Sequence, residues 1–195
     1  MAGGGARQPR VEGGGDLLKV EHVSKSFTIR KAGLFGGDTG GSLLAVDDVS
    51  FVVRRGECLG LVGESGCGKT TVARTLMRLL DHQAQISGQV QMQGQNVLQV
   101  KGKALRQLRS RLQIIFQDPY GSLDPRMMVG DILLEGLTAL RPELDAKARR
   151  KRIETLVDQV GLPKNALDRY AHEFSGGQRQ RIAIARALAV EPAVL

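Results

Sequence analysis

The hydrophobic positions near the start of the chain recur at short, strand-like intervals. Residues 1–15 form a glycine-rich lead without periodicity, which predicts a flexible segment. Apolar residues over 17–29 then predict a first strand or strand pair, and a loop with five glycines follows over 31–42. Alternating apolar residues over 49–53 predict another strand, which turns at Arg55-Gly56.

The pattern after this turn changes from strand to helix. The continuous apolar run over 58–62 is typical of a short buried strand, and helical spacing over 72–80 predicts a helix. Between them lies a glycine-rich segment, which therefore joins a strand end to a helix start. Further on, residues 88–100 predict a β hairpin or ribbon, 105–111 a short helix and 112–116 another apolar strand.

Residues 118–170 have helical periodicity and predict a helical insertion between two stretches of α/β core. Their clearest helix has apolar residues at i, i+3, i+4 and i+7 from Ile153 to Val160, and Gly161-Leu162-Pro163 ends it. A later helix begins at Ser175 and ends at Glu191-Pro192. Residues 193–195 then read as the start of an apolar strand.

Length and composition fit one enzyme-sized domain. The chain has 195 residues, of which 42% are hydrophobic and 25% charged, so it can bury a real core. It has no apolar run of membrane-spanning length and no signal-peptide pattern at its start. Cys58 and Cys67 lie outside any CxxC or zinc-like spacing and predict reduced thiols, although Cys67 is placed where modification could reach the phosphate site.

The formal charge of +8 does not decide function. Basic residues gather over 101–111 and over 147–152. Solvated helix faces, contact with an anionic membrane surface or partner, and specific nucleic-acid binding all remain open. We expect no specific nucleic-acid partner, because no aromatic residues for base stacking lie among these charges.

A phosphate-binding motif occupies the strand-to-helix junction. Residues 63–71 match G-x-x-x-x-G-K-[ST], and free N–H groups at a helix start favour anions. Lys69 is expected to reach the β- and γ-phosphates, and the Thr70 hydroxyl to bind Mg²⁺. The residues predicted to bind nucleotide here are Gly63, Glu64, Ser65, Gly66, Cys67, Gly68, Lys69, Thr70 and Thr71.

A second helix start has related chemistry. Ser175 and Gln178 have the spacing of a capping box, which structurally needs no more than a well-capped helix. Chemically, its free N–H groups lie beside Gly176 and Gly177, with several arginines following, and they suggest a second anion-binding terminus. Two such termini in one chain suggest a sandwich in which each binds a phosphate.

These motifs, in this order, resemble the nucleotide-binding subunit of ATP-binding cassette (ABC) transporters over about residues 16–195. Walker A is the 63–71 segment, Gln117 corresponds to the Q-loop, and Phe174–Gln178 is similar to the signature, with Phe174 where leucine is commoner. The segment 116–127 and the glycine-containing loop after Phe27 resemble the oligopeptide and dipeptide importer group.

The resemblance implies a fold and a division of the chain. It implies an α/β P-loop NTPase (RecA-like) core with an N-terminal antiparallel β subdomain and a helical ABC subdomain, incomplete at the C-terminus. Residues 1–15 would be a flexible lead and 16–195 the nucleotide-binding domain, with 118–170 as the helical subdomain. The aspartate, glutamate and histidine that the family carries after the signature do not occur in residues 1–195. This polypeptide alone is therefore expected to bind ATP weakly and to hydrolyse it hardly at all.

The resemblance also implies roles for individual residues. Lys69 and Gln117 would be catalytic, Thr70 and Gln117 would contact Mg²⁺, and Phe27 would stack on adenine unless it is a core aromatic. The signature would bind the γ-phosphate of ATP held by an opposite subunit, through Ser175, Gly176, Gly177 and Gln178. His172 precedes the signature and is expected to be structural. His22 and His82 have no partner at readable spacing.

Three functions remain open from the sequence. The first is the ATPase subunit of a peptide-type importer, on the cytoplasmic face of the inner membrane. Its partners would be transmembrane permease subunits, a second ABC ATPase subunit and, indirectly, a solute-binding protein. The second is an ABC ATPase of another transport or soluble system, and the third a non-catalytic nucleotide-binding module. The transported solute and the choice between homodimer and heterodimer do not follow from the sequence.

Overall fold

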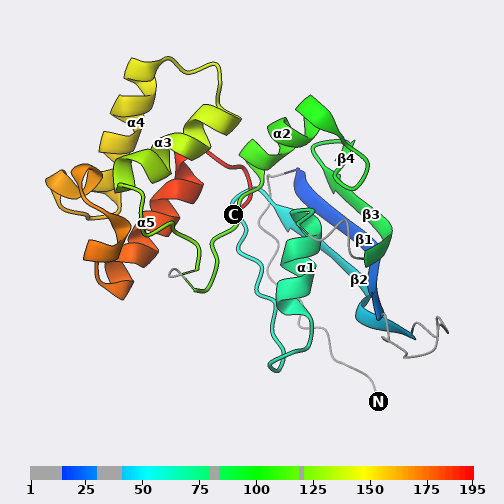
Figure 1. Ribbon diagram of the computed structural model, residues 1–195. Coiled ribbons are helices and arrows are strands. Elements are labelled where there is room, and N and C mark those ends of the chain that lie inside the picture. Colours follow the sequence, from blue (N-terminus) through cyan, green and yellow to red (C-terminus); the bar gives the residue numbers. More distant parts are fainter. Residues whose placement is uncertain (1–14, 30–40, 80–83, 119–120) are drawn as a thin grey trace, which may run out of the picture. The chain divides into compact units, whose positions relative to one another are not determined.

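The computed structural model describes residues 15–29, 41–79, 84–118 and 121–195 (Figure 1). Most of the predicted loop over 31–42 and His82 lie outside this range. The chain divides into two compact units, Met1–Gln99 and Val100–Leu195. Each unit has its own secondary structure.

The first unit contains a sheet of antiparallel strands. Strands β1 (Asp16–Ile29), β2 (Gly41–Arg54), β3 (Ala84–Met92) and β4 (Gln95–Asn96) lie in the order β2-β1-β3-β4. Val20 of β1 pairs with Phe51 on one side and Val90 on the other, and both valines are buried. The strand predicted over 17–29 is therefore confirmed as β1, and the predicted hairpin is β3–β4, but β2 begins at Gly41, well before the predicted strand over 49–53.

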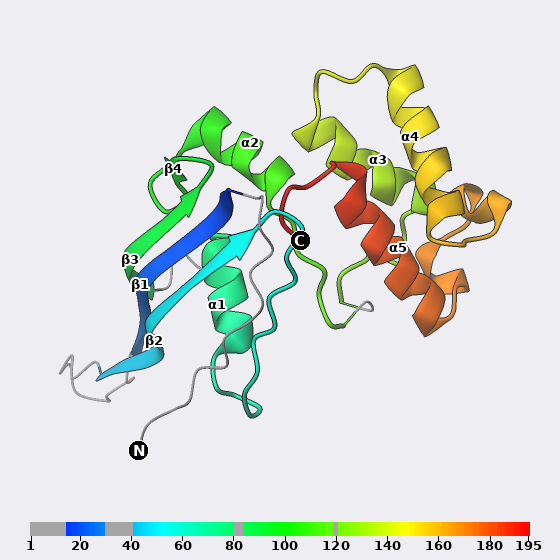
Figure 2. The same cartoon turned by 180° about the vertical axis from the view of Figure 1, so that it is seen from behind.

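Helix α1 (Lys69–Leu76) lies alongside one face of this sheet (Figures 1 and 2). It buries Val72 and Leu76, as the helical spacing predicts. The helix is shorter than predicted, because Met77 forms its C-cap and Arg78 takes a left-handed backbone with φ 53°. Leu80 lies outside the described residues.

The predicted buried strand over 58–62 is wrong in this structure. The segment has no regular secondary structure, and Val62 is 97% exposed. A continuous apolar run specifies a buried strand only where neighbouring strands provide ladder hydrogen bonds. Within the described residues, no strand pairs with residues 58–62.

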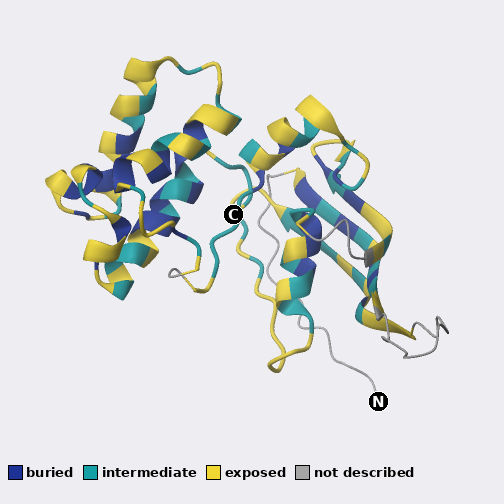
Figure 3. Cartoon of the chain, viewed as in Figure 1, coloured by how far each residue is buried: buried dark blue, intermediate teal, exposed yellow. Residues whose placement is uncertain are grey.

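The second unit is mainly helical, with α2 (Gly102–Arg111), α3 (Val129–Leu140), α4 (Ala146–Gln159) and α5 (Gly176–Ala189). Two 3₁₀ turns, η2 (Lys164–Asp168) and η3 (Ala171–Glu173), precede α5. Leucine and isoleucine side chains of α3, α4 and α5 belong to one buried cluster. Figure 3 colours the buried residues of these helices dark blue. The helices predicted within 118–170 therefore occur over 129–140 and 146–159, whereas the described residues 121–128 contain no helix.

The predicted strand over 112–116 is reduced to one bridge. Leu112 forms an isolated parallel bridge with Val194, and the Gln113 N–H donates to the Val194 carbonyl at 3.0 Å. Residues 193–195 therefore have the extended pairing that their apolar character predicts, but a single bridge is not a strand. Gln117 follows at a bend and is exposed.

Candidate nucleotide-binding site

The loop over residues 63–68 leads directly into α1. Gly68 is the N-cap of the helix, and the Val72 N–H donates to its carbonyl at 2.9 Å. Within the loop, the Cys67 N–H donates to the Glu64 carbonyl at 3.3 Å, which closes a turn. Helix geometry leaves the first N–H groups of α1 without an intrahelical acceptor, so they are available to an anion.

Two glycines of the loop take a conformation that other residues avoid. Gly66 has φ 85° and Gly68 has φ 96°. A Cβ atom added to Gly68 would lie 2.7 Å from the Ala45 carbonyl oxygen, whereas one added to Gly66 would meet nothing within 4 Å. Backbone conformation therefore explains glycine at position 66, and close approach to β2 adds a second reason at position 68.

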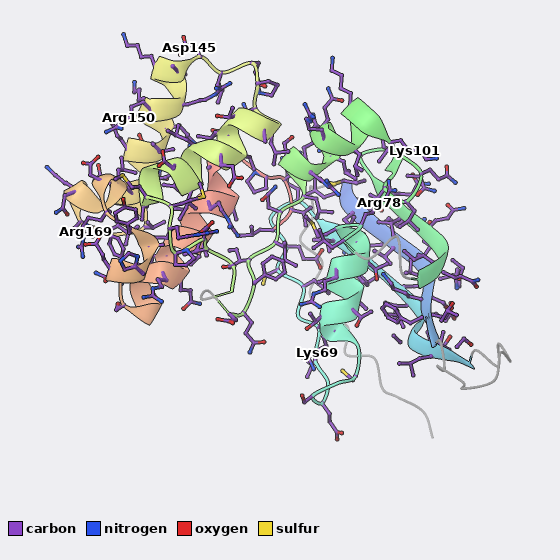
Figure 4. All side chains as sticks on the ribbon, viewed as in Figure 1. Lys69, Arg78, Lys101, Asp145, Arg150 and Arg169 are labelled. Atoms are coloured by element: carbon purple, nitrogen blue, oxygen red, sulfur yellow. The ribbon has the colours of Figure 1, made fainter. Side chains whose placement is uncertain are left out.

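The Lys69 ammonium is held over the loop (Figure 4). Its Nζ donates to the carbonyls of Gly63 and Glu64, both at 2.7 Å, and lies 3.5 Å from the Cys67 Sγ. An ammonium group has three donors, so the weakest of these contacts is the one a phosphate oxygen can replace most easily. The loop thus places a positive charge beside the free N–H groups of the helix start.

These features fit a nucleotide phosphate and its magnesium ion. Left-handed glycines, a helix start and a lysine are the elements of a phosphate cradle. Thr70 is exposed at the same helix start. Among the described residues no group of three or more His, Cys, Asp or Glu could hold a metal ion. Mg²⁺ with a nucleotide needs only one or two protein ligands beside phosphate and water, so the Thr70 hydroxyl is a suitable donor.

The second predicted helix start forms the capping box that its sequence indicates. Ser175 is the N-cap of α5: its Oγ accepts from the Gln178 N–H at 3.4 Å, and its own N–H donates to Gln178 Oε1 at 3.0 Å. Gly177 is exposed, with open space around its Cα. Phe174 is buried, and the Arg169 guanidinium lies 4.5 Å from its ring centroid. An aromatic residue therefore anchors the chain just before the cap.

The arginines after this cap have structural partners. Arg179 donates to the Ala171 and His172 carbonyls at 3.0 and 2.7 Å, and Arg181 donates to the Gly161 carbonyl at 2.9 Å. Arg186 donates to the Ser122 carbonyl at 2.6 Å, and burial lowers its pKa. The sequence associates these arginines with anion binding and does not reveal their carbonyl partners, because no spacing rule connects the side chains of α5 to carbonyls outside the helix.

The contacts of Gln117 and Phe27 do not indicate a role for either side chain. Gln117 is exposed at the bend after residues 113–116. Phe27 lies in β1 opposite Leu43, half-buried, with the Lys25 Nζ 5.5 Å from its ring centroid. The structure brings residues 63–71 together in one unit and residues 175–178 together in the other. The roles of all these residues remain predictions.

The histidines and cysteines are explained by local contacts. His172 Nδ1 lies 2.9 Å from the Pro125 carbonyl, and its ring stacks on Tyr170, which supports a structural role. His22 does have a partner: its Nδ1 lies 2.7 Å from Asp48 Oδ1. Antiparallel pairing of β1 with β2 creates this contact, and sequence spacing does not reveal it. The two cysteines, Cys58 and Cys67, are free, as predicted, but Cys58 is exposed, whereas the strand predicted over 58–62 would have buried it.

The basic residues of α4 are mostly engaged within the second unit. Arg150 pairs with Glu154, Arg152 pairs with Glu191, and Arg149 donates to the Arg141 and Pro142 carbonyls. The basic residues over 101–111 form no ion pair among the described residues and are exposed. No described helix combines the length and apolar character needed to cross a membrane.

Comparison with known proteins identifies relatives of this chain. The family model described as ABC transporter matches residues 46–195. The oligopeptide transport ATP-binding protein OppF of Bacillus subtilis is 47% identical over 177 residues, which are 90% of this chain and 54% of the relative. OppF of Haemophilus influenzae is 42% identical over 179 residues, which are 92% of this chain and 53% of the relative. This chain therefore spans about half the length of these relatives.

A solved structure of an ATP-binding cassette has a similar fold. The dimeric, post-hydrolysis structure of the ATP-binding cassette MJ0796 bound to ADP and Pi aligns with a TM-score of 0.71 at 25% identity. The alignment covers 90% of this chain and 70% of that one. The fold is accordingly α/β, of the ABC ATPase cassette type, with an antiparallel sheet.

Proposed function

Because the chain belongs to the ABC transporter family, we propose that it is an ATP-binding subunit that couples ATP binding and hydrolysis to solute import. The observation that carries the proposal is the loop over 63–68, where left-handed glycines and the Lys69 ammonium surround a helix start. The names of the relatives indicate an oligopeptide or dipeptide as the solute.

The residues of the loop have distinct tasks in this proposal. Backbone N–H groups of residues 63–71 bind the phosphate oxygens, and Lys69 exchanges its contact with Cys67 Sγ for a β- or γ-phosphate oxygen. Thr70 and Gln117 would hold Mg²⁺, and Phe27 would stack on adenine. Bound Mg²⁺ supplies charge neutralisation to the transferring phosphoryl group. Lys69 and Gln117 then stabilise charge and orient water.

The signature segment acts on a second subunit. Ser175 and Gln178 fix the start of α5, so that Gly176 and Gly177 present their N–H groups to the γ-phosphate of ATP on an opposite subunit. The exposure of Gly177 supports this role, because it leaves room for a phosphate to approach the backbone. Two nucleotide sites then form only when two such subunits associate.

The remaining partners follow from this role. The segment after Gln117, within a helical subdomain over 118–170 of the 16–195 domain, contacts a transmembrane permease at the cytoplasmic face of the membrane. A solute-binding protein acts through the permease, and no nucleic acid takes part. Peptide specificity belongs to those partners.

Co-expression of the full-length subunit with its permease tests the proposal. We expect the permease to retain the wild-type subunit and to stimulate its ATP turnover. Lys69→Ala should remain bound to the permease but lose the stimulated turnover, whereas the exposed Lys103→Ala should retain both. A wild-type subunit that neither binds nor responds to the permease would contradict the proposal.

A further inference from the structure

Residues 122–128 precede α3 and have no regular secondary structure, yet many contacts hold them in place. Leu123 is 5% exposed, and Asp124 Oδ1 accepts from the Arg126 N–H at 2.9 Å. Met128 forms an antiparallel bridge with Tyr170, flanked by hydrogen bonds from Val129 N–H to the Arg169 carbonyl at 2.9 Å and from Ala171 N–H to the Met127 carbonyl at 3.3 Å. The segment is therefore attached to the residues that lead into α5.

Two side chains bind backbone carbonyls at the start and in the middle of this segment. Arg186 of α5 donates to the Ser122 carbonyl at 2.6 Å, and its guanidinium is partly buried near the charge of Glu135. His172 lies two residues before Phe174, and its Nδ1–H donates to the Pro125 carbonyl at 2.9 Å. Since a carbonyl only accepts, this contact requires the proton on Nδ1.

Further contacts hold the backbone and the ring of His172. Arg179 donates to the Ala171 and His172 carbonyls at 3.0 and 2.7 Å, and Tyr170 stacks on the His172 ring with centroids 5.5 Å apart. The N-terminal part of α5 thus holds the histidine, and the histidine holds Pro125. Arg186, two turns after Arg179 in α5, makes a second attachment between this helix and the segment through the Ser122 carbonyl.

We propose that Arg186 and His172 are positioning residues that hold residues 122–128 in one rigid body with the start of α5 at Ser175. This inference rests on the proposed function, in which Ser175 faces the nucleotide of an opposite subunit and the segment after Gln117 faces a permease. A displacement at either end is then transmitted to the other through the Ser122 carbonyl, bound by Arg186 of α5, and the Pro125 carbonyl, bound by His172. A partly buried guanidinium is costly to desolvate, and its use on a single loop carbonyl fits a requirement for fixed position.

Substitutions in the full-length subunit, assembled with its permease in lipid vesicles, test the coupling. Arg186→Lys keeps the charge but loses the planar guanidinium, and His172→Ala removes an exposed side chain whose loss should leave the fold intact. We expect both to lower permease-stimulated ATP turnover by about tenfold, the size of a typical coupling between sites. Basal turnover of the isolated subunit and its affinity for ATP should stay within about twofold.

Two matched variants separate positioning from general stability. Arg181→Lys alters an arginine of the same helix that contacts the Gly161 carbonyl instead, and it should leave stimulated turnover unchanged. His172→Asn retains a side-chain N–H near the Nδ1 position and should restore most of the stimulation that His172→Ala loses. An equal loss in Arg181→Lys, or a parallel fall of basal and stimulated turnover in the His172 and Arg186 variants, would overturn the inference.

Hydrogen exchange of the isolated chain measures, without a permease, how firmly residues 122–128 are attached to the residues before and within α5. In His172→Ala, we expect backbone amides over 123–129 to exchange about tenfold faster than in the wild type, while amides of α4 stay unchanged. Unchanged exchange over 123–129 would overturn the attachment itself. If the wild-type subunit showed no permease stimulation, the proposed function and the coupling role would both fail, whereas faster exchange would still establish the attachment.

Discussion

Replacing single glycines by alanine around the phosphate loop separates the two reasons for glycine there. Gly60 has an ordinary φ and open space around its Cα, Gly66 has φ 85° and open space, and Gly68 has φ 96° and a close neighbour. The three positions therefore add one physical cost at a time. The chain itself provides the matched controls.

The magnitudes follow from these geometries. Gly60→Ala should be neutral, or stabilising by up to about 1 kcal/mol, because alanine restricts the unfolded chain. Gly66→Ala places a Cβ in the left-handed region, at a cost of about 1–2 kcal/mol. Gly68→Ala has that cost and also a Cβ 2.7 Å from the Ala45 oxygen, which forces α1 and β2 apart. We expect about 2–4 kcal/mol in total for Gly68→Ala, with overpacking as the added term.

Urea unfolding followed by far-ultraviolet circular dichroism measures these differences, with amide exchange of α1 as a local probe of the first unit. The predicted loss of stability is smallest for Gly60→Ala, larger for Gly66→Ala and largest for Gly68→Ala. Equal losses for Gly66→Ala and Gly68→Ala would refute the steric argument. A loss of more than about 1 kcal/mol for Gly60→Ala would refute the use of backbone geometry as the guide.

Three further predictions concern the cap, pH and turnover. Ser175→Ala should destabilise the second unit by about 0.5–1 kcal/mol in urea unfolding, less than Asp145→Ala, because the Asp145 Oδ1 accepts from Ala148 N–H at 2.7 Å and the Ser175 bond is longer; the reverse order would contradict this. A hydrogen bond from the Tyr170 N–H lowers the pKa of Glu173. The ionised carboxylate of Glu173 therefore contributes its full share to the stability of the fold above the ordinary glutamate pKa of about 4.3, and this stabilisation is lost as pH falls through the lowered pKa. An NMR titration midpoint at or above the ordinary value would oppose this. A polypeptide of residues 1–195 should bind ATP weakly and hydrolyse it hardly at all, and Lys69-dependent turnover near that of full-length relatives would exclude this.

Local sequence patterns predicted the elements whose stabilising contacts are local. The Ser175–Gln178 capping box and the α4 end at Gly161, with φ 67°, follow from residues a few positions apart. Apolar spacing also predicted β1 and part of β2, although the pairing of these strands is long-range. The phosphate-loop motif is also a local pattern, and it correctly predicted the positive φ angles of Gly66 and Gly68.

The failures share a different cause, which is dependence on distant partners. The apolar run over 58–62 resembles a buried strand, but a strand also needs neighbours, and no described strand provides them. Arg181 and Arg186 of α5 resemble anion ligands, but backbone carbonyls 20 and 64 residues earlier in the sequence accept their hydrogen bonds. His22 meets Asp48 only because β1 pairs with β2. Patterns within a window cannot predict such contacts.

Equilibrium binding of ATP is the most direct test of the central claim that residues 63–71 cradle a nucleotide. Titration of the chain with a fluorescent ATP analogue and Mg²⁺ compares wild type, Lys69→Ala and the exposed control Lys103→Ala. Loss of a charged hydrogen bond predicts affinity at least about tenfold weaker for Lys69→Ala and unchanged for Lys103→Ala. Equal affinities for wild type and Lys69→Ala, or no binding by the wild type, would contradict the claim.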